Sequence, residues 1–226
     1  MRVPDTSPPA PGRRDWPSGA PTLVVFAKAP TPGVAKTRLI PALGAAGAAQ
    51  LARQMLAHTL AQALASNAGP VELCMSPDPL ADAWHGIALP DAVEGTAQGE
   101  GDLGQRMARA MNRVLDDGRP VLLMGTDGPE LDAALLRKTA AQLTRHDAVL
   151  LPASDGGYLL IGLRAPCAAI FENMVWSTDT VAAETRRRLA LDQRSVWVGP
   201  TLHDIDEPAD LAHLPSKLNF FSDLCQ

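Results

Sequence analysis

The sequence predicts a single α/β domain whose central strands are parallel. Short, continuously apolar segments alternate with longer segments in which leucine recurs at helical spacing. A strand, helix and strand joined by short connections almost always form a right-handed parallel unit. The length of 226 residues is sufficient to bury the core of one large domain.

The composition excludes several classes of protein. Hydrophobic residues make up 46% of the chain and charged residues 20%, as in ordinary globular proteins. The net charge of -5 argues against a nucleic-acid-binding surface, which depends on a clustered basic face. Three widely spaced cysteines match no zinc or redox motif and indicate a reducing compartment. Residues 1–21 lack the apolar core of a secretory signal. We therefore expect a cytoplasmic protein without membrane insertion, with a flexible tail at 1–21, a domain at 22–215 and a C-terminal tail at 216–226.

The first predicted strand leads into a basic loop. Residues 22–27 are β-branched and aromatic between prolines, which is typical of a buried parallel strand. The loop that follows carries Lys28, Lys36 and Arg38. Ligands of open α/β sheets bind outside the carboxyl ends of the strands, so these cations indicate a phosphate site. An ordinary solvated loop is the alternative, because most surface Lys and Arg have no other role.

A crossover helix and a second strand follow. Leucines recur at helical spacing over residues 51–64, and residues 71–76 form the next apolar segment. Residues 77–101 are irregular, with a possible short strand at 87–89. Long loops in compact domains are often binding loops.

A helix start follows this loop. Asp102 and Gln105 have the spacing of a capping box. Free N–H groups at such a start can bind an anion or a base edge, so we include Gly101 and Arg106 among the candidate nucleotide-binding residues. An ordinary capped helix explains the same residues equally well.

Two carboxylates come directly after buried strands. Asp127 follows the strand predicted at 119–125, and Asp155 follows the one predicted at 148–152. We expect both carboxylates at one edge of the sheet and assign both as candidate catalytic residues, with Asp127 as the ligand of a divalent cation. The alternatives are a turn-stabilising Asp127 and a simple hairpin corner at Asp155.

The C-terminal third supplies the remaining candidates. Trp176 either packs in the core or lines an acceptor pocket, and Ser177 or Thr178 is a possible cap of the next helix. Further strands are expected at 158–163 and 195–198. Asp204 and Asp206 form a D-x-D pattern, which elsewhere can bind metal; here we favour capping of a short closing helix.

Together these segments resemble the bacterial arsenosugar-biosynthesis-type glycosyltransferases, which are nucleotide-diphospho-sugar transferase-like proteins of glycosyltransferase A-type fold. The resemblance rests on FAKAPTPGVAKTRL (26–39), GDLGQRM (101–107), GTDGPEL (125–131), PASDGGYLLIGL (152–163), WST (176–178) and DIDEPADL (204–211). The basic loop and the strand-end Asp also resemble 2-phospholactate and molybdenum cofactor guanylyltransferases.

This resemblance implies a Rossmann-like three-layer domain with a mostly parallel mixed sheet. It implies that the three loop cations face a nucleotide's phosphates and that Asp127 binds Mg²⁺ or Mn²⁺. The sugar or acceptor side would comprise Asp155, Gly156, Gly157 and Tyr158, with Trp176 and Ser177 beside them. One departure is Gly128, where the family pattern leads us to expect a cysteine; this glycine would loosen the turn that aims Asp127.

The leading hypothesis is a metal-dependent glycosyltransferase that uses a nucleoside-diphosphate sugar and a small-molecule acceptor. One alternative is a nucleotidyltransferase that acts on a phosphorylated metabolite, and another is a catalytically inactive nucleotide-binding protein. No nucleophile is implied, because no G-x-S-x-G motif surrounds Ser177.

Overall fold

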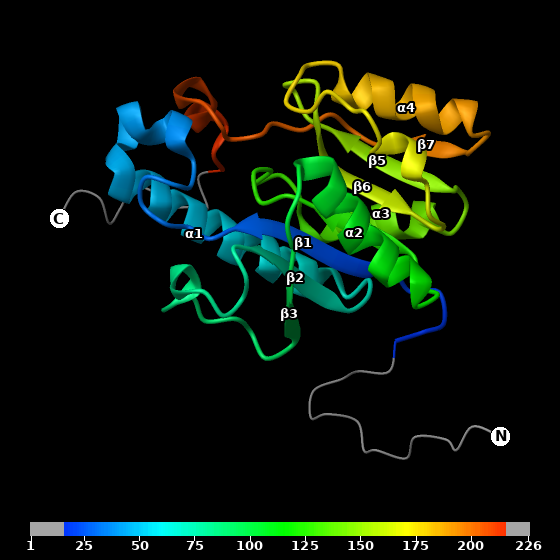
Figure 1. Cartoon of the computed structure of the whole chain (residues 1–226), viewed down its shortest axis with the longest axis horizontal. Coiled ribbons are helices and arrows are strands. Elements are labelled where there is room, and N and C mark those ends of the chain that lie inside the picture. The colour runs from blue at the N-terminus through cyan, green and yellow to red at the C-terminus, as the bar shows by residue number, and fades with distance from the viewer. Residues whose placement is uncertain (1–15, 216–226) are drawn as a thin grey trace, which may run out of the picture.

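The computed structural model describes residues 16–215, which form one α/β domain around a seven-stranded sheet (Figure 1). The strands are β1 (Thr22–Lys28), β2 (Val71–Ser76), β3 (Val93–Ala97), β4 (Val121–Met124), β5 (Ala148–Pro152), β6 (Tyr158–Leu163) and β7 (Val196–Val198). The helices are α1 (Ile40–Ser66), α2 (Leu103–Asp116), α3 (Ala133–Leu143) and α4 (Val181–Leu191). Four short 3₁₀ helices are also present: η1 (Thr37–Leu39), η2 (Asp82–Trp84), η3 (Ala168–Ile170) and η4 (Pro208–His213).

The sheet is mixed and mostly parallel, as expected. Its strand order is β3-β2-β1-β4-β6-β5-β7, and only β6 pairs antiparallel, with β4 on one side and β5 on the other. The carboxyl ends of the other six strands therefore share one edge, where β6 begins. Of the predicted tails, residues 1–15 and 216–226 lie outside the described residues.

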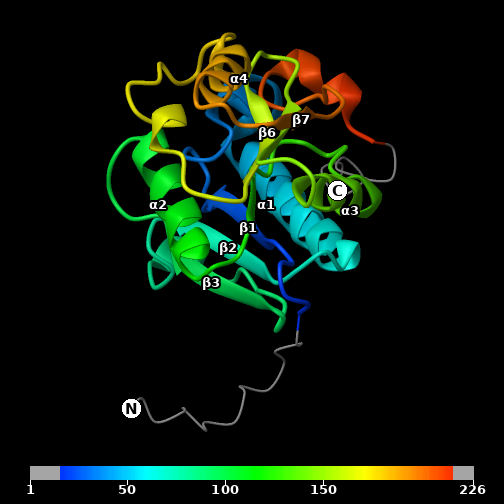
Figure 2. The ribbon, with the colours of Figure 1, turned by 90° about the vertical axis from the view of Figure 1, so that its right-hand side faces the viewer.

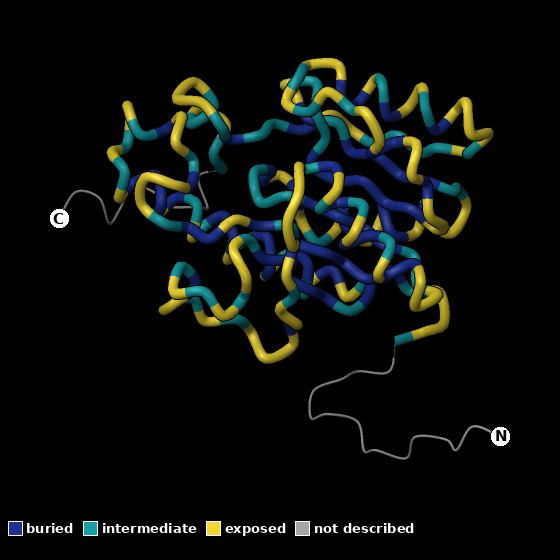
Figure 3. Tube along the Cα trace, viewed as in Figure 1, coloured by how far each residue is buried: buried dark blue, intermediate teal, exposed yellow. Residues whose placement is uncertain are grey.

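Helices cover both faces of the sheet, with α1 and α3 on one side and α2 and α4 on the other (Figure 2). The alternation of side chains along β1 shows why both faces are apolar. Leu23 and Val25 pack in the α1 and α3 layer, whereas Val24 packs in the α2 and α4 layer. The central strands are consequently buried, and exposed residues gather on the outer helix faces and loops (Figure 3).

One predicted strand was misplaced. The strand after β2 is Val93–Ala97, not residues 87–89. Ile87 and Leu89 instead pack against the apolar cluster without pairing in the sheet. β3 is an edge strand in which only Val93 is fully buried, so its hydrophobic pattern is weak.

Helix starts were predicted with mixed success. The capping box at α2 is confirmed: Asp102 Oδ1 accepts from Gln105 N at 2.8 Å, and Gln105 Oε1 accepts from Asp102 N at 3.0 Å. The predicted cap of α4 by Ser177 or Thr178 is wrong. The N-cap position is Thr180, which makes no capping bond through its side chain, and Ser177 lies three residues earlier with a φ of 61°.

After β7 the chain returns across the sheet edge to the start of α1. We call residues 202–214 the C-terminal strap; Figure 1 shows it in orange and red. Its anchor is Ile205, which is fully buried in a small cluster with Leu39, Ala48, Leu51 and Met55. Ile205 N also donates to Asp127 O at 2.9 Å, which ties the strap to the turn after β4.

The carboxylate that caps η4 is not the predicted one. Asp210 Oδ2 accepts from Glu207 N at 2.6 Å and from Asp206 N at 3.0 Å. The Asp206 side chain points elsewhere, to Arg38. The capping interpretation of Asp206 is therefore wrong, because a carboxylate inside the first turn reaches back to the free N–H groups.

Replacing Asp210 with Ala should lower the free energy of unfolding by about 0.5–2 kcal/mol, the usual cost of a lost capping interaction. Asp206→Ala is the matched control. It removes only an exposed ion pair, so its cost should stay within about 1 kcal/mol. Urea unfolding of both variants measures the difference, and a larger loss for Asp206→Ala would contradict the assignment of the cap.

Gly162 in β6 should not tolerate a side chain. A Cβ there would lie 2.5 Å from Leu122 Cδ2 and 2.6 Å from Val149 Cγ2. Gly162→Ala should therefore cost about 1–3 kcal/mol of unfolding free energy through overpacking. Gly125→Ala is the control, because no atom lies within 4 Å of its added Cβ. Equal melting temperatures for the two variants would contradict this packing.

Candidate functional site

A cavity of about 280 Å³ opens at the carboxyl ends of β1 and β4. Four of the predicted site residues line it: Lys28, Lys36, Arg38 and Asp127. Asp206 of the C-terminal strap lines it as well, although the sequence interpretation gave that residue a capping role. The basic loop and Asp127 therefore lie together at one edge of the sheet, as expected.

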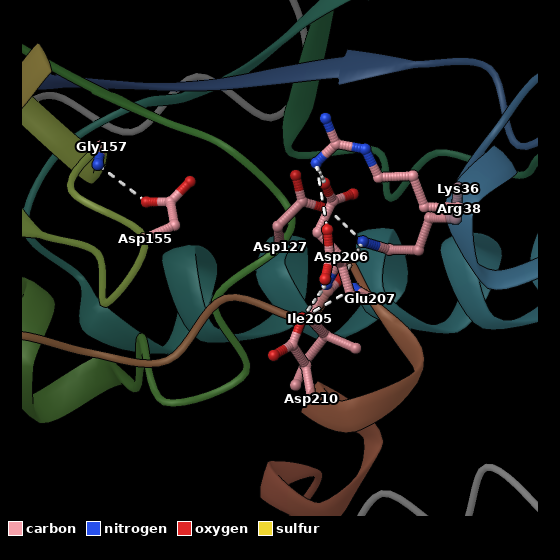
Figure 4. A network of polar contacts seen from close by, with 9 residues as sticks. All are labelled: Lys36, Arg38, Asp127, Asp155, Gly157, Ile205, Asp206, Glu207 and Asp210. Atoms are coloured by element: carbon pink, nitrogen blue, oxygen red, sulfur yellow. Dashed lines mark hydrogen bonds and ion pairs between the residues drawn. The ribbon is translucent and has the colours of Figure 1, made fainter. Parts of the chain in front are cut away.

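Lys36 and Asp127 form the centre of this arrangement (Figure 4). Lys36 Nζ lies 2.6 Å from Asp127 Oδ1 and also donates to the carbonyl oxygen of Ile205. Its side chain is only 6% exposed, whereas that of Asp127 is 48% exposed. Lys36 also has a left-handed backbone, with φ 48° and ψ 47°. Such strain in a non-glycine residue persists where the surrounding structure holds it, and functional sites are a common place for it.

Arg38 is held more loosely. Its Nη1 donates to Asp206 Oδ2 at 2.8 Å and lies 3.9 Å from Glu207 Oε1, with 63% of the side chain exposed. Exposed ion pairs contribute little free energy because water screens both charges. The Arg38 guanidinium therefore stays accessible to a competing anion. Lys28, at the end of β1, is also exposed.

The donor set fits a divalent cation that is completed by ligand oxygens. Asp127 and Asp206 line the same cavity, and Mg²⁺ is usually held by one or two carboxylates together with phosphate oxygens. Asp127 Oδ2 makes no hydrogen bond to another described residue, so it is open to a cation. Within residues 16–215 there is no group of three or more His, Cys, Asp or Glu residues that could hold a metal ion.

Asp155 lies apart from this network (Figure 4). Its Oδ1 accepts from Gly157 N at 2.7 Å in the turn that joins β5 to antiparallel β6. Because β6 lies between β4 and β5, Asp155 and Asp127 are separated along the sheet edge. Asp155 instead faces Asp204, whose pKa is raised mainly by burial and then by the negative charge of Asp155.

The two carboxylates of the D-x-D pattern therefore have different partners. Asp204 Oδ1 accepts from Ser154 Oγ at 3.2 Å on the β5 side. Asp206 turns to Arg38 on the β1 side. Extended backbone places side chains at i and i+2 on the same side, so the D-x-D spacing alone does not predict these different partners.

The remaining predicted site residues lie near α2 and α4 and do not line this cavity. Gly156 has a φ of 88° and its carbonyl accepts from Ala182 N, while Gly157 binds Asp155. Burial raises the pKa of Tyr158, whose ring packs in the α2 and α4 layer. Trp176 packs against the start of α2: a Cβ on Gly104 would lie 2.6 Å from its Nε1.

Arg106 is tied to the strand ends through a residue that the sequence interpretation missed. Gln98 is 3% exposed, and its Nε2 donates to the carbonyls of Ala27 and Cys74, each at 3.0 Å. Its Oε1 accepts from Arg106 Nη1 at 2.8 Å. Gly101, with a φ of 110°, lies in the turn just before the α2 capping box. Glutamines are mostly exposed, so only the fold identifies this buried one.

Gly128 follows Asp127 in the turn after β4. Its carbonyl accepts from Leu131 N at 3.1 Å. A Cβ there would lie 2.5 Å from Leu159 Cδ1, so the glycine lets β6 pack closely against the turn.

A second cavity, of about 350 Å³, lies between residues 173–175 and α4 and contains none of the predicted site residues. In the described part of the chain, none of the helices is both long and apolar enough to cross a membrane. The cytoplasmic location stays a prediction.

Comparisons with known structures identify relatives of the whole domain. A protein from Desulfovibrio desulfuricans G20, described as a "putative nucleotide-diphospho-sugar transferase", shares 30% identity and a TM-score of 0.80, over 92% of this chain and 90% of that one. Rv0371c of Mycobacterium tuberculosis H37Rv is 16% identical with a TM-score of 0.57, over 86% of this chain and 97% of that one. A manganese complex of Rv0371c has also been solved.

A more distant structure is the 4-diphosphocytidyl-2C-methyl-D-erythritol synthase of Anaerococcus prevotii DSM 20548. It is 13% identical with a TM-score of 0.56, over 89% of this chain and 99% of that one. At these identities the likeness shows the fold alone. The D. desulfuricans structure, at 30% identity, confirms the resemblance to nucleotide-diphospho-sugar transferase-like proteins.

The search of curated proteins finds no match. Residues 59–178 match a family described as "Uncharacterized protein conserved in bacteria (DUF2064)". This match covers more than half of the chain, from α1 to the segment before α4. The chain therefore belongs to the DUF2064 family and has the fold of nucleotide-diphospho-sugar transferases.

Proposed function

We propose that the protein transfers a glycosyl group from a nucleoside-diphosphate sugar to a small-molecule acceptor, with Mg²⁺ or Mn²⁺ bound. The observation that carries this proposal is the cavity in which Lys28, Lys36 and Arg38 meet Asp127 and Asp206. Cations and carboxylates at the ends of parallel strands suit a metal-bound diphosphate. The D. desulfuricans relative, 30% identical and described as a transferase of this class, supports it.

The loop cations would bind the diphosphate. Lys28 and Arg38 are exposed at the cavity, and the exposed ion pair of Arg38 with Asp206 leaves its guanidinium accessible to phosphate oxygens. Lys36 is pre-oriented by Asp127 and by the Ile205 carbonyl. Charge-assisted hydrogen bonds from these groups would be strongest on the departing diphosphate, because negative charge develops there.

Asp127, with Asp206 beside it, would hold the divalent cation. When bound, this ion would neutralise charge on the diphosphate leaving group. Asp127 is the better candidate because the turn after β4 fixes it and Ile205 N binds its carbonyl. Asp206 depends on the strap and on Arg38.

The remaining predicted site residues would form the nucleotide and sugar sides of the site. Gly101 and Arg106 lie at the start of α2, which Gln98 links to the end of β1. Asp155, Gly156 and Gly157 lie in the turn between β5 and β6, Trp176 packs against the start of α2, and Ser177 precedes α4. Tyr158 would act through packing, because its hydroxyl is buried.

A nucleotidyltransferase is the second candidate. The same three cations would also suit a triphosphate, and the more distant structures of this fold include a synthetase solved with CTP. The two candidates differ in the nucleotide that should bind best.

A nucleoside diphosphate or its sugar conjugate should raise the melting temperature only when Mg²⁺ or Mn²⁺ is present. At about 100 times its dissociation constant, a ligand adds about 2.7 kcal/mol to the free energy of unfolding. A thermal-shift screen of nucleoside diphosphates, diphosphate sugars and triphosphates, with and without Mn²⁺, measures this. Stabilisation by triphosphates alone would favour the second candidate. If no nucleotide raised the melting temperature, an inactive scaffold would be the remaining interpretation.

Lys36→Met and Arg38→Met should each weaken nucleotide binding at least tenfold. A charge-assisted hydrogen bond contributes about 1.5–3 kcal/mol. Arg53→Met is the matched control, since Arg53 is an exposed arginine of α1 outside the cavity and bonds only the Gly86 carbonyl among the described residues. Titration calorimetry with the nucleotide found in the screen, in Mn²⁺, measures the affinities. Unchanged affinity in both cavity variants would show that the loop is only a connection.

A further inference from the structure

Lys36 and the proposed metal ion would share one carboxylate. Lys36 Nζ lies 2.6 Å from Asp127 Oδ1, in an ion pair whose lysine side chain is only 6% exposed. A Mg²⁺ ion binds a carboxylate oxygen at about 2.0–2.1 Å. A cation on either oxygen of Asp127 would therefore lie within a few ångströms of the ammonium.

The Lys36 ammonium and a divalent cation at Asp127 would repel each other strongly. Coulomb repulsion grows with the product of the charges and falls with distance and with the effective dielectric constant. The exposure of Lys36 is too low for water to screen its ammonium well. Removing the positive charge should therefore make Asp127 a better metal ligand.

The cavity gives the Lys36 ammonium a direction in which it can leave Asp127. Behind the ammonium, the Ile205 carbonyl accepts its second hydrogen bond, and the Ile205 side chain holds the strap in a buried apolar cluster with Leu39 and Leu51. In front lies the cavity that Lys28 and Arg38 also line. A phosphate group in that cavity would attract the ammonium away from Asp127.

We propose that Lys36 is a resident counter-ion of Asp127, with which a divalent cation competes until a diphosphate takes up the ammonium. This inference rests on the proposed metal and diphosphate site. Metal and diphosphate then bind with positive coupling, because each relieves the contact that hinders the other. The coupling is reciprocal, as linkage requires.

The test is the affinity for Mn²⁺ alone, in the absence of any nucleotide. Free Mn²⁺ is measured by electron paramagnetic resonance during titration of the wild-type protein and of Lys36→Met, which keeps the apolar stem of the side chain. Lys36→Met should bind Mn²⁺ at least tenfold more tightly than the wild type. Lys28→Met is the matched control, because it removes the same charge from the same cavity but not from Asp127; its affinity should change less than threefold.

Further variants secure the interpretation. Lys36→Gln should reproduce the gain, and it serves in place of Lys36→Met if that variant does not fold. Lys36→Arg, which keeps the charge, should show no gain. Adding Asp127→Asn to Lys36→Met should abolish the tight Mn²⁺ binding.

Three outcomes would overturn the proposal. The first is an unchanged Mn²⁺ affinity in both neutral variants of Lys36. The second is an equal gain of Mn²⁺ affinity in Lys28→Met. The third is a gain that persists when Asp127→Asn is added to Lys36→Met. Since no nucleotide is present, failure of the nucleotide-sugar function would appear in the thermal-shift screen and leave this titration unaffected. If nucleotides raise the melting temperature but the neutral Lys36 variants gain no Mn²⁺ affinity, only the counter-ion role of Lys36 is rejected.

Discussion

The contact between Lys36 and Asp127 joins three segments that are far apart in the sequence. Lys36 belongs to the loop after β1, Asp127 to the turn after β4, and the Ile205 carbonyl to the C-terminal strap. A nearly buried ammonium needs both partners, because an unpaired charge away from water is very costly. The position of the loop, of the turn and of the strap is therefore coupled at a single point.

This junction also explains the local backbone. Lys36 keeps a left-handed conformation, which is unfavourable for a residue with a side chain, because its stem and ammonium are held from both sides. The cations at the mouth of the cavity are less constrained: Arg38 is 63% exposed. The site thus combines one nearly buried, paired cation with more accessible ones, an arrangement suited to receiving an anion.

The antiparallel strand β6 divides the sheet edge. On one side, β1 and β4 bring Lys36, Asp127 and Asp206 together. On the other side, the turn after β5 carries Asp155, whose negative charge raises the pKa of Asp204 in the strap. The sheet edge therefore carries two regions with different polar groups.

The sequence by itself determined most of the sheet and the basic cavity. Continuous apolar segments and bounding prolines predicted β1, β2, β4 and β5, because buried parallel strands carry that pattern. Since parallel strands share an edge, Lys28, Lys36, Arg38 and Asp127 were placed together correctly. Only the tertiary structure decided the rest: the position of edge strand β3, the buried Gln98, the separation of Asp155 and the turn of Asp206 toward Arg38. These features depend on contacts between distant segments and on one reversed strand, and neither local periodicity nor capping patterns encode such contacts.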